Sequence, residues 1–197
     1  SAMPLDRIEA PYYVCNPRTR LQQGDLLRDL TVSEVSVAST EGASVDKRPV
    51  PYCVVLSQDC DLLHDFNSSL AQGDRNDDKT LPAFLFCPAY RTEFFRAGTH
   101  LEDQNKTMRR IDSNKEWEKI ASNQSLRYHY LERRDDLQVP ELVVDFKHYF
   151  TIPRPLVYRE EFRKSYFVTL EILYRDHLSS RFAHYLSRIG LPELTSP

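Results

Sequence analysis

The sequence has no apolar stretch close to the roughly 20 residues that a membrane-spanning helix needs, and no basic start followed by an apolar signal core. Its four cysteines are widely spaced, and none belongs to a Cys-x-x-Cys pair. Cys53 and Cys87 lie in apolar runs, where a small buried thiol is the ordinary interpretation. We therefore expect a cytoplasmic protein with reduced cysteines, no disulfide, no bound zinc and no membrane partner.

An excess of positive charge is also missing. The chain carries 26 Lys and Arg residues against 29 Asp and Glu residues, which gives a formal net charge of −3. This balance does not indicate a nucleic-acid-binding protein, although a local basic face needs no overall excess. The sequence contains no phosphate-binding loop, dinucleotide-binding fingerprint, nucleophile elbow or internal repeat, so none of these motifs identifies a function.

The length of 197 residues suits one domain. We predict a single α+β domain over residues 4–197, whose sheet comes from about 21–90 and 126–170. A helical segment is expected over about 93–125, and a C-terminal helix over about 172–190. No part of this organisation requires a cofactor, and we expect none.

Two apolar runs, residues 52–57 and 83–87, give the strongest strand signals. Because they do not alternate with polar residues, we expect two adjacent central strands that are covered on both faces. Ser113 and Glu116 form a capping-box pattern, which predicts that a helix begins there. Another signal is an apolar stripe on the C-terminal helix, made by Leu178, Phe182, Leu186 and Ile189 before the terminating Gly190.

The remaining segments are assigned from alternation and polarity. Residues 32–37 alternate apolar and polar side chains and are predicted to form a half-buried strand. Residues 39–47 are small and polar, which is typical of a surface loop, and residues 65–80 are predicted to form a mobile polar loop. Strands are also expected within residues 126–131 and 165–170, and over residues 141–152 around an apolar centre.

The first candidate for chemistry is the polar segment that follows the central strand at Ser57. The flanking Asp59 and Asp61 would raise the pKa of the Cys60 thiol, which weakens a nucleophilic role for it. Asp59, Cys60, Asp61 and His64 could instead bind a metal, although four ligands within six residues make an awkward tetrahedral site. The common alternative is a turn in which the aspartates accept bonds from backbone amides.

A second candidate is the expected strand around residues 127–130. Its alternation places Arg127 and His129 on one face, and Tyr128 and Tyr130 on the other. Arg127 and His129 could bind a phosphate and exchange a proton near neutral pH. The alternative is a solvated face opposite a tyrosine-rich core face.

Two further groups of histidines are considered. Asp145 and His148 are three positions apart on an expected strand, so they face opposite ways and cannot act directly as a pair. His177, Arg181 and His184 share one face of the C-terminal helix. That face could form a binding surface, although a solvated helix face is the more common explanation.

Several segments spread over most of the chain resemble an uncharacterised family of bacterial proteins. They are Gln23-Gly24-Asp25, Val54-Val55-Leu56-Ser57-Gln58-Asp59-Cys60-Asp61, Arg127-Tyr128-His129-Tyr130-Leu131, Val144-Asp145 and Arg188-Ile189-Gly190-Leu191-Pro192. That family carries no activity that could be transferred to this chain.

Four segments within about the first ninety residues follow one another in a second familiar order: Gly24-Asp25-Leu26, Arg48-Pro49, Val54-Val55-Leu56-Ser57 and Leu85-Phe86-Cys87-Pro88. This order is similar to that of the PemK/MazF toxins. The resemblance implies a small SH3-like β-barrel that cuts single-stranded RNA without a metal, with Arg48 at the scissile phosphate. That family also uses a Thr or Ser just past the later proline, and Tyr90 stands in its place here.

From these patterns we expect an SH3-like, PemK/MazF-type barrel with a helical insertion and a C-terminal helix. The leading hypothesis is a toxin-like or defence-associated bacterial protein that engages RNA, as a metal-independent endoribonuclease. Its expected catalytic residues are Arg48, Ser57 and Asp59, and its expected substrate-binding residues are Asp61, Arg127 and His129. The alternative is a non-catalytic module that binds a protein partner, such as an antitoxin or an effector.

Overall fold

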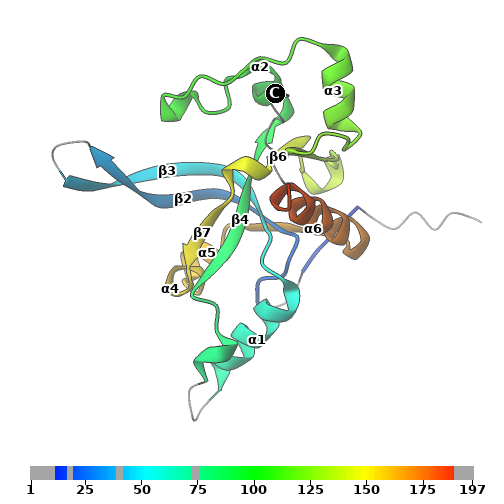
Figure 1. Ribbon diagram of the computed structural model, residues 1–197. Helices are drawn as coiled ribbons and strands as arrows, with labels where there is room; N and C mark the ends of the chain where they lie inside the picture. The colour runs from blue at the N-terminus through cyan, green and yellow to red at the C-terminus, as the bar shows by residue number, and fades with distance from the viewer. Residues whose placement is uncertain (1–11, 17–19, 39–41, 72–75, 189–197) are drawn as a thin grey trace, which may run out of the picture.

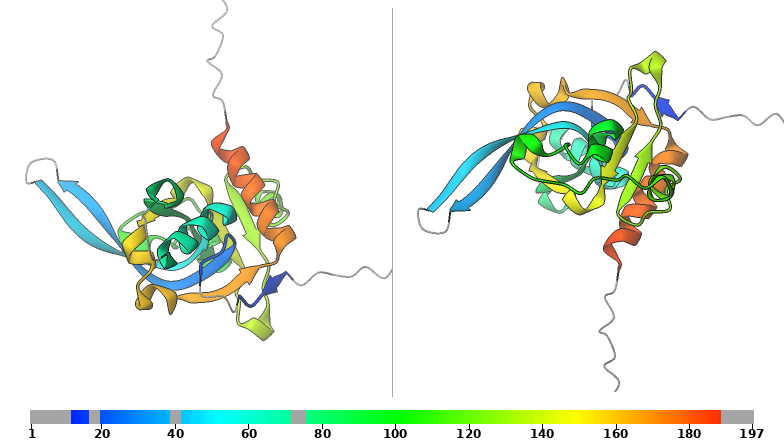
Figure 2. Two further views of the ribbon diagram at one scale, coloured as in Figure 1. Left: turned by 90° about the horizontal axis from the view of Figure 1, so that it is seen from below. Right: turned by 90° about the horizontal axis from the view of Figure 1, so that it is seen from above.

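The computed structural model of the chain describes residues 12–16, 20–38, 42–71 and 76–188 (Figure 1). Within these residues, eight antiparallel strands form one sheet in the order β1-β8-β2-β3-β4-β6-β5, and β7 pairs with β4 off this path. The sheet curls into a half-barrel (Figure 2). The strands are β1 Tyr13–Val14, β2 Asp25–Ala38, β3 Gly42–Val55, β4 Ala83–Arg91, β5 Tyr128–Leu131, β6 Leu142–Asp145, β7 Phe150–Pro153 and β8 Tyr166–Leu170.

Helices surround this sheet and divide its core into three parts. One part lies under α6, one lies near α1, α4 and α5, and one lies under α2 and α3. No helix in the described residues is long and apolar enough to cross a lipid bilayer. The helices are α1 Asp59–Leu70, α2 Thr92–Ala97, α3 Asn114–Ala121, α4 Arg154–Val157, α5 Glu160–Arg163 and α6 Ile172–Leu186, with 3-10 turns η1 Asp77–Lys79, η2 Glu102–Gln104, η3 Asp135–Leu137 and η4 Phe146–His148.

The two central strands are confirmed as neighbours. β3 pairs with β4 through Val55 and Phe86, and both residues are fully buried. Adjacent side chains on β3 point to opposite faces of the sheet. Val54 therefore packs in the same cluster as Leu178 of α6, whereas Val55 packs with Leu62 of α1. The continuous apolar run is explained by this cover on both faces.

The β2–β3 hairpin extends well beyond the body of the protein (Figure 2). We call its outer part, residues 31–38 and 42–47, the arm. The strand predicted over residues 32–37 is confirmed as part of β2, but its predicted half burial is wrong at Val35, which is 65% exposed, as its cross-strand neighbour Val45 is at 69%. The predicted loop is also wrong over residues 42–47, which pair with β2; residues 39–41 lie outside the described part of the chain.

The predicted mobile loop at residues 65–80 is wrong in its first part, which belongs to α1. The cause is Asp65, whose side chain is completely buried. It accepts hydrogen bonds from the Leu81 amide at 2.8 Å, from Arg154 Nε at 2.8 Å and from the Tyr158 hydroxyl. A polar residue therefore anchors this helix from inside, while residues 72–75 lie outside the description.

The strand predicted over residues 141–152 is interrupted. β6 and β7 both lie along one edge of β4, where Val144 pairs with Ala89 and Phe150 pairs with Phe86. Between these pairs the chain leaves the sheet as η4. Pro88 of β4 lies beside this gap and offers no backbone N–H to a partner strand. The result is a tight turn where the sequence predicted an extended segment.

The other predicted elements are confirmed, with adjusted ends. β5 and β8 fall where strands were expected, and Ser113 Oγ accepts the Glu116 amide at 3.3 Å at the start of α3. On α6, Leu178 and Phe182 are buried as predicted, but Leu186 is 52% exposed. Ile189 and Gly190 lie outside the described residues.

Candidate functional site

A buried carboxylate at the end of β6 organises the strongest candidate site. Asp145 is fully buried, and its two oxygens accept a bidentate pair from Arg127, with Nε at 2.8 Å and Nη2 at 2.7 Å. Asp145 also caps η4 by accepting the Lys147 amide at 3.0 Å. The η4 turn then brings His148 Nδ1 to 3.2 Å from Asp145 Oδ2. The prediction that Asp145 and His148 face opposite ways is therefore wrong, because the segment turns instead of extending.

This geometry prepares His148 for proton transfer. Its Nδ1 faces the carboxylate, so Nε2 is the nitrogen left for a substrate, and the side chain is 30% exposed. An aspartate in this position fixes the orientation and tautomer of a histidine. Burial lowers the pKa of His148 and the negative charge of Asp145 partly offsets this, so the neutral imidazole prevails at pH 7.

A second histidine reaches the same centre from the segment after α2. Gly98 ends α2 in the left-handed conformation (φ +76°), and a Cβ there would lie 2.6 Å from the Met108 carbonyl oxygen. Glycine therefore lets the following chain fold back closely. The fold-back places the His100 ring 4.6 Å from the ring of Tyr90 on β4.

Tyr90 and His100 carry buried polar atoms that are poorly satisfied, although the backbone of Phe94 interacts with His100. The Tyr90 hydroxyl and both ring nitrogens of His100 are buried, and none makes a well-aligned hydrogen bond within the described residues. Each such atom costs about 1–3 kcal/mol of stability, so it is usually retained for a reason other than packing. Burial also lowers the pKa of His100. We call Tyr90, His100, Arg127, Asp145 and His148 the Asp145 cluster.

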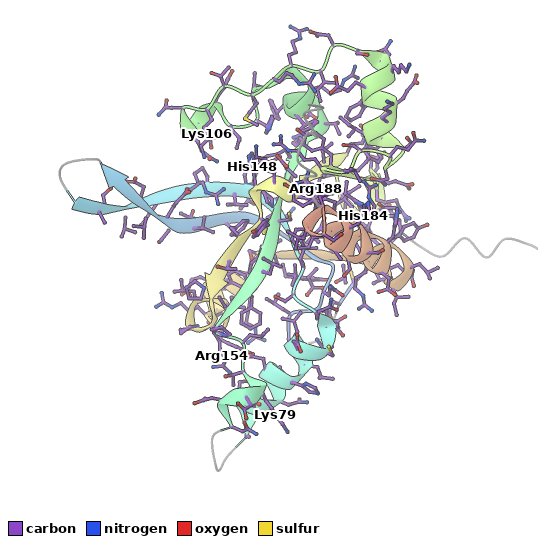
Figure 3. The ribbon with its side chains drawn as sticks, in the orientation of Figure 1. Lys79, Lys106, His148, Arg154, His184 and Arg188 are labelled. Atoms are coloured by element: carbon purple, nitrogen blue, oxygen red, sulfur yellow. The ribbon has the colours of Figure 1, made fainter. Side chains whose placement is uncertain are left out.

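A groove of about 460 Å³ lies between the arm and the η2 segment. Figure 3 shows two labelled side chains, Lys106 and His148, on the same side of the hairpin, and Lys106 is close enough to contribute to lowering the pKa of His148. Arg48 lies over the ring of Phe150 at 5.2 Å and acts electrostatically on Tyr90. The residues lining the groove include Glu34, Arg48, Asp103, Asn105 and Lys106. Because Arg48 and Lys106 act on Tyr90 and His148, the groove lies near the Asp145 cluster, although no residue of the cluster lines it.

The predicted site residues are only partly brought together. Arg48 lines the groove, with Nε 3.1 Å from Glu34 Oε2. Ser57 and Asp59 lie instead at the start of α1, away from the arm and η2 (Figure 1). Ser57 Oγ accepts the Leu85 amide at 2.8 Å, and Asp59 pairs with Arg20 at 3.1 Å.

Asp61 is exposed on α1. Among the residues that the structure describes, no three His, Cys, Asp or Glu side chains are placed to share a metal ion. Asp59, Cys60, Asp61 and His64 therefore do not converge as a metal site in this structure.

Arg127 and His129 do not share a face as predicted. Arg127 precedes β5 and turns to Asp145, whereas His129 is buried to 1% exposure beside His177 of α6, with their rings 5.3 Å apart. Burial lowers the pKa of His129 well below its usual value. On α6, Arg181 donates to the carbonyl oxygens of residues 123, 125 and 128, so it holds a loop and is not a free surface group.

Sequence reasoning missed Tyr90, His100, Lys106 and the role of His148. They come from separate segments, and no spacing in the sequence connects them. Comparisons with protein-family models, curated proteins and solved structures found no match for this chain. Its function must therefore be inferred from the geometry of the site.

Proposed function

We propose that the Asp145 cluster and the adjoining groove bind single-stranded RNA and cleave it without a metal ion. The observation that carries this proposal is the meeting of His100 and His148 with Arg127 and Asp145, next to Lys106. Two histidines can exchange protons near neutral pH, and the cations can stabilise a phosphate whose charge increases in the transition state.

The half-barrel and the place of Arg48 in the groove agree with the resemblance to PemK/MazF toxins. We therefore propose a barrel of that SH3-like type, acting in a toxin-like or defence-associated role. The active centre, however, differs from the one that the resemblance implies. His148 is the base in this proposal, and the expected catalytic residues Ser57 and Asp59 take no part.

In the proposed reaction, His148 Nε2 accepts the proton of a ribose 2′-hydroxyl. The 2′-oxygen then forms a bond to the adjacent phosphorus, and the bond between that phosphorus and the 5′-oxygen breaks. Protonated His100, whose ring nitrogens are buried in this structure, turns toward the groove and gives its proton to the departing 5′-oxygen. Arg48 and Lys106 bind the non-bridging oxygens, and Arg127 holds Asp145 in place. The products end in a 2′,3′-cyclic phosphate and a 5′-hydroxyl.

This mechanism needs one neutral and one protonated histidine. Because burial lowers the pKa of both His100 and His148, the required combination is most populated below the usual histidine pKa of about 6.5. We expect a bell-shaped dependence of kcat/KM on pH with its maximum on the acid side of that value. A rate that rises steadily to pH 8 would contradict these roles.

Charge in the groove is balanced, since Lys47, Arg48 and Lys106 lie near Glu34, Asp46 and Asp103. Binding therefore depends on a few well-placed contacts. For two phosphate contacts, the logarithm of the association constant is expected to fall with the logarithm of salt concentration with a slope of about −1.4.

The test compares a labelled single-stranded RNA with DNA of the same sequence. DNA lacks the attacking 2′-hydroxyl, so it should bind and remain intact, and RNA cleavage should persist in a metal chelator. His148→Gln should abolish cleavage, whereas His184→Gln should not, because His184 is an exposed histidine on α6 (Figure 3). Cleavage of DNA, or equal activity of both variants, would refute the proposal.

The arm favours a second function, as a protein-binding module without catalysis. Val35 and Val45 form an exposed apolar pair on its surface, far above the exposure of core valines. If wild-type protein is inert toward RNA but Val35→Asp abolishes binding of an antitoxin or effector, the module hypothesis holds. The reverse pattern supports the enzyme.

A further inference from the structure

A second cavity, of about 300 Å³, lies between α1 and the α4–α5 segment. It shares no lining residue with the groove at Arg48. Its inner wall is apolar, because Leu62, Phe84 and Val157 are only 2–4% exposed and contribute hydrocarbon side chains. Phe66 adds an aromatic ring from α1. Cavities of this size with mostly apolar walls are typical of small-molecule sites.

The mouth of the cavity is formed by its exposed lining residues, which are Tyr158, Glu160, Arg163 and Lys164. Lys164 Nζ lies 3.0 Å from Glu160 Oε1, but both side chains are more than 70% exposed, so this pair is weak. The Arg163 side chain makes no ion pair or hydrogen bond to any described residue. The mouth therefore presents a guanidinium that is available to an anion.

The deep end contains a carboxylate that is already occupied. Asp25 is 1% exposed. It accepts bonds from Thr169 Oγ1 at 2.7 Å, from the Gln22 amide at 2.8 Å and from Asn16 Nδ2 at 3.3–3.4 Å. These bonds use the lone pairs that a ligand cation would need. Arg20 also lines the cavity, but its guanidinium is already paired with both carboxylate oxygens of Asp59. Asp25 therefore repels an anionic group from the deep end without offering a site to a cationic one.

The wall beside the mouth is held in place. Tyr158 donates its hydroxyl to Asp65, and its ring meets Phe84 edge-on with centroids 6.1 Å apart. Arg154, which pairs with Asp65 at 2.8 Å, also lies over the Tyr158 ring. A wall fixed in this way requires little ordering when a ligand enters, which favours binding.

We infer that this cavity binds a small amphipathic anion that is free in solution. Its apolar body lies against Leu62, Phe66 and Phe84, and its single anionic head lies at the mouth on Arg163. The charge difference between the cationic mouth and the occupied Asp25 sets this orientation.

The inference is tested by calorimetric titration of the full chain with three ten-carbon probes: decanoate, decanol and decylammonium. Decanoate is expected to bind about tenfold more tightly than decanol, because only decanoate gains the charged contact. Decylammonium is expected to bind least. Equal binding of the anion and the cation would overturn the inference, as would the absence of decanoate binding.

Variants distinguish the contribution of the anionic head group to binding from that of the apolar body. Arg163→Glu should weaken decanoate binding about tenfold and change decanol binding little. Arg159→Glu is the matched control, since Arg159 is an exposed arginine that does not line the cavity. Leu62→Trp fills the cavity and should abolish binding of both probes, provided that its melting curve stays cooperative. Equal losses in the Arg159 and Arg163 variants would refute the assigned head site.

Vesicles of phosphatidylglycerol distinguish the two sources of such a ligand. A site for a free anion leaves the protein in the supernatant after sedimentation. Sedimentation with vesicles that Arg163→Glu abolishes would assign the cavity to a membrane lipid and overturn the inference of a free ligand. Neither result depends on the groove, so it is independent of RNA cleavage.

Discussion

Two buried aspartates, Asp65 and Asp145, are held in nearly the same way at different places in the protein. Each is fully buried, and each accepts an arginine Nε at 2.8 Å, from Arg154 and Arg127 respectively. Each also accepts a hydrogen bond from a backbone amide. These partners offset part of the large desolvation cost of burying a carboxylate.

The third partner differs between the two centres. At Asp65 it is Tyr158, whose pKa is raised to about 12 by burial and by the hydrogen bond to Asp65. At Asp145 it is His148, whose pKa is lowered by burial, an effect that the negative charge of Asp145 partly offsets. The same carboxylate–arginine arrangement therefore serves stability in one place and can serve chemistry in the other, depending on the side chain that completes it.

The largest expected effect is the loss of stability when either carboxylate is removed. Asp65→Ala and Asp145→Ala should each lower the free energy of unfolding by about 3–5 kcal/mol, because each leaves a partly buried arginine without its partner. Urea denaturation measures this loss, with the exposed Asp136→Ala as control. In RNA assays corrected for folded protein, only Asp145→Ala should be inactive. Equal activity of the two variants would remove the distinction between the centres.

The next prediction compares His148 with Tyr158, the side chains that complete the two centres. His148→Gln should reduce RNA cleavage by about 10²–10⁴-fold, as expected for loss of a general base, with a small change in stability. Tyr158→Phe should cost about 1–2 kcal/mol, because Asp65 loses one hydrogen bond, and should leave cleavage unchanged. Single-turnover kinetics and denaturation of both variants decide this. A catalytic defect in Tyr158→Phe would show that the two centres are coupled.

A third carboxylate tests what arginine contributes. Asp25 is buried like the other two, but its hydrogen bonds come from neutral donors, and burial raises its pKa to about 6. Its folded pKa thus exceeds the unfolded value of about 3.9, so the stability it contributes is complete below pH 4 and is lost as pH rises through 6. That loss is about 3 kcal/mol, and Asp25→Asn should remove it. The free energy of unfolding is measured from pH 4 to 7 for the wild type and for Asp25→Asn. The same pH dependence in both proteins would contradict this prediction.

The smallest effect concerns Arg48. Glu34→Gln removes an ion pair whose acidic partner is 56% exposed, so stability should change by less than about 0.5 kcal/mol. RNA binding should instead strengthen a few-fold, because Arg48 is released toward the phosphate. Fluorescence anisotropy measures this, with Glu118→Gln on α3 as control. Weaker binding would mean that Glu34 positions Arg48 for the substrate.

The sequence identified the strands that are buried on both faces. The apolar runs of β3 and β4 required cover on both faces, and the structure provides it. Alternation around Val35 indicated a strand, but alternation cannot show whether anything packs against the face that a side chain presents. The second half of α1 was predicted as a loop because its residues are mostly polar. Nothing in the sequence shows that Asp65 is buried, since its hydrogen-bond partners lie at residues 81, 154 and 158.

The candidate site was harder to predict for a related reason. Arg48 and Arg127 could be selected for their chemistry, but His148 reaches Asp145 only because η4 interrupts the strand. His100 reaches Tyr90 only because the chain turns back at Gly98. Such turns depend on cap and strand-edge contacts between distant segments, which a single sequence does not display.

The place of β2 in the sheet has a consequence for biosynthesis. β2 lies between β3, which follows it directly, and β8, which is translated only after most of the described chain. β8 pairs with β2 only at residues 25–27, so until β8 emerges from the ribosome this inner end of the hairpin has unpaired backbone groups, which can recruit other nascent chains. Completion of the sheet is therefore a late, non-local step, and such steps are slow in folding.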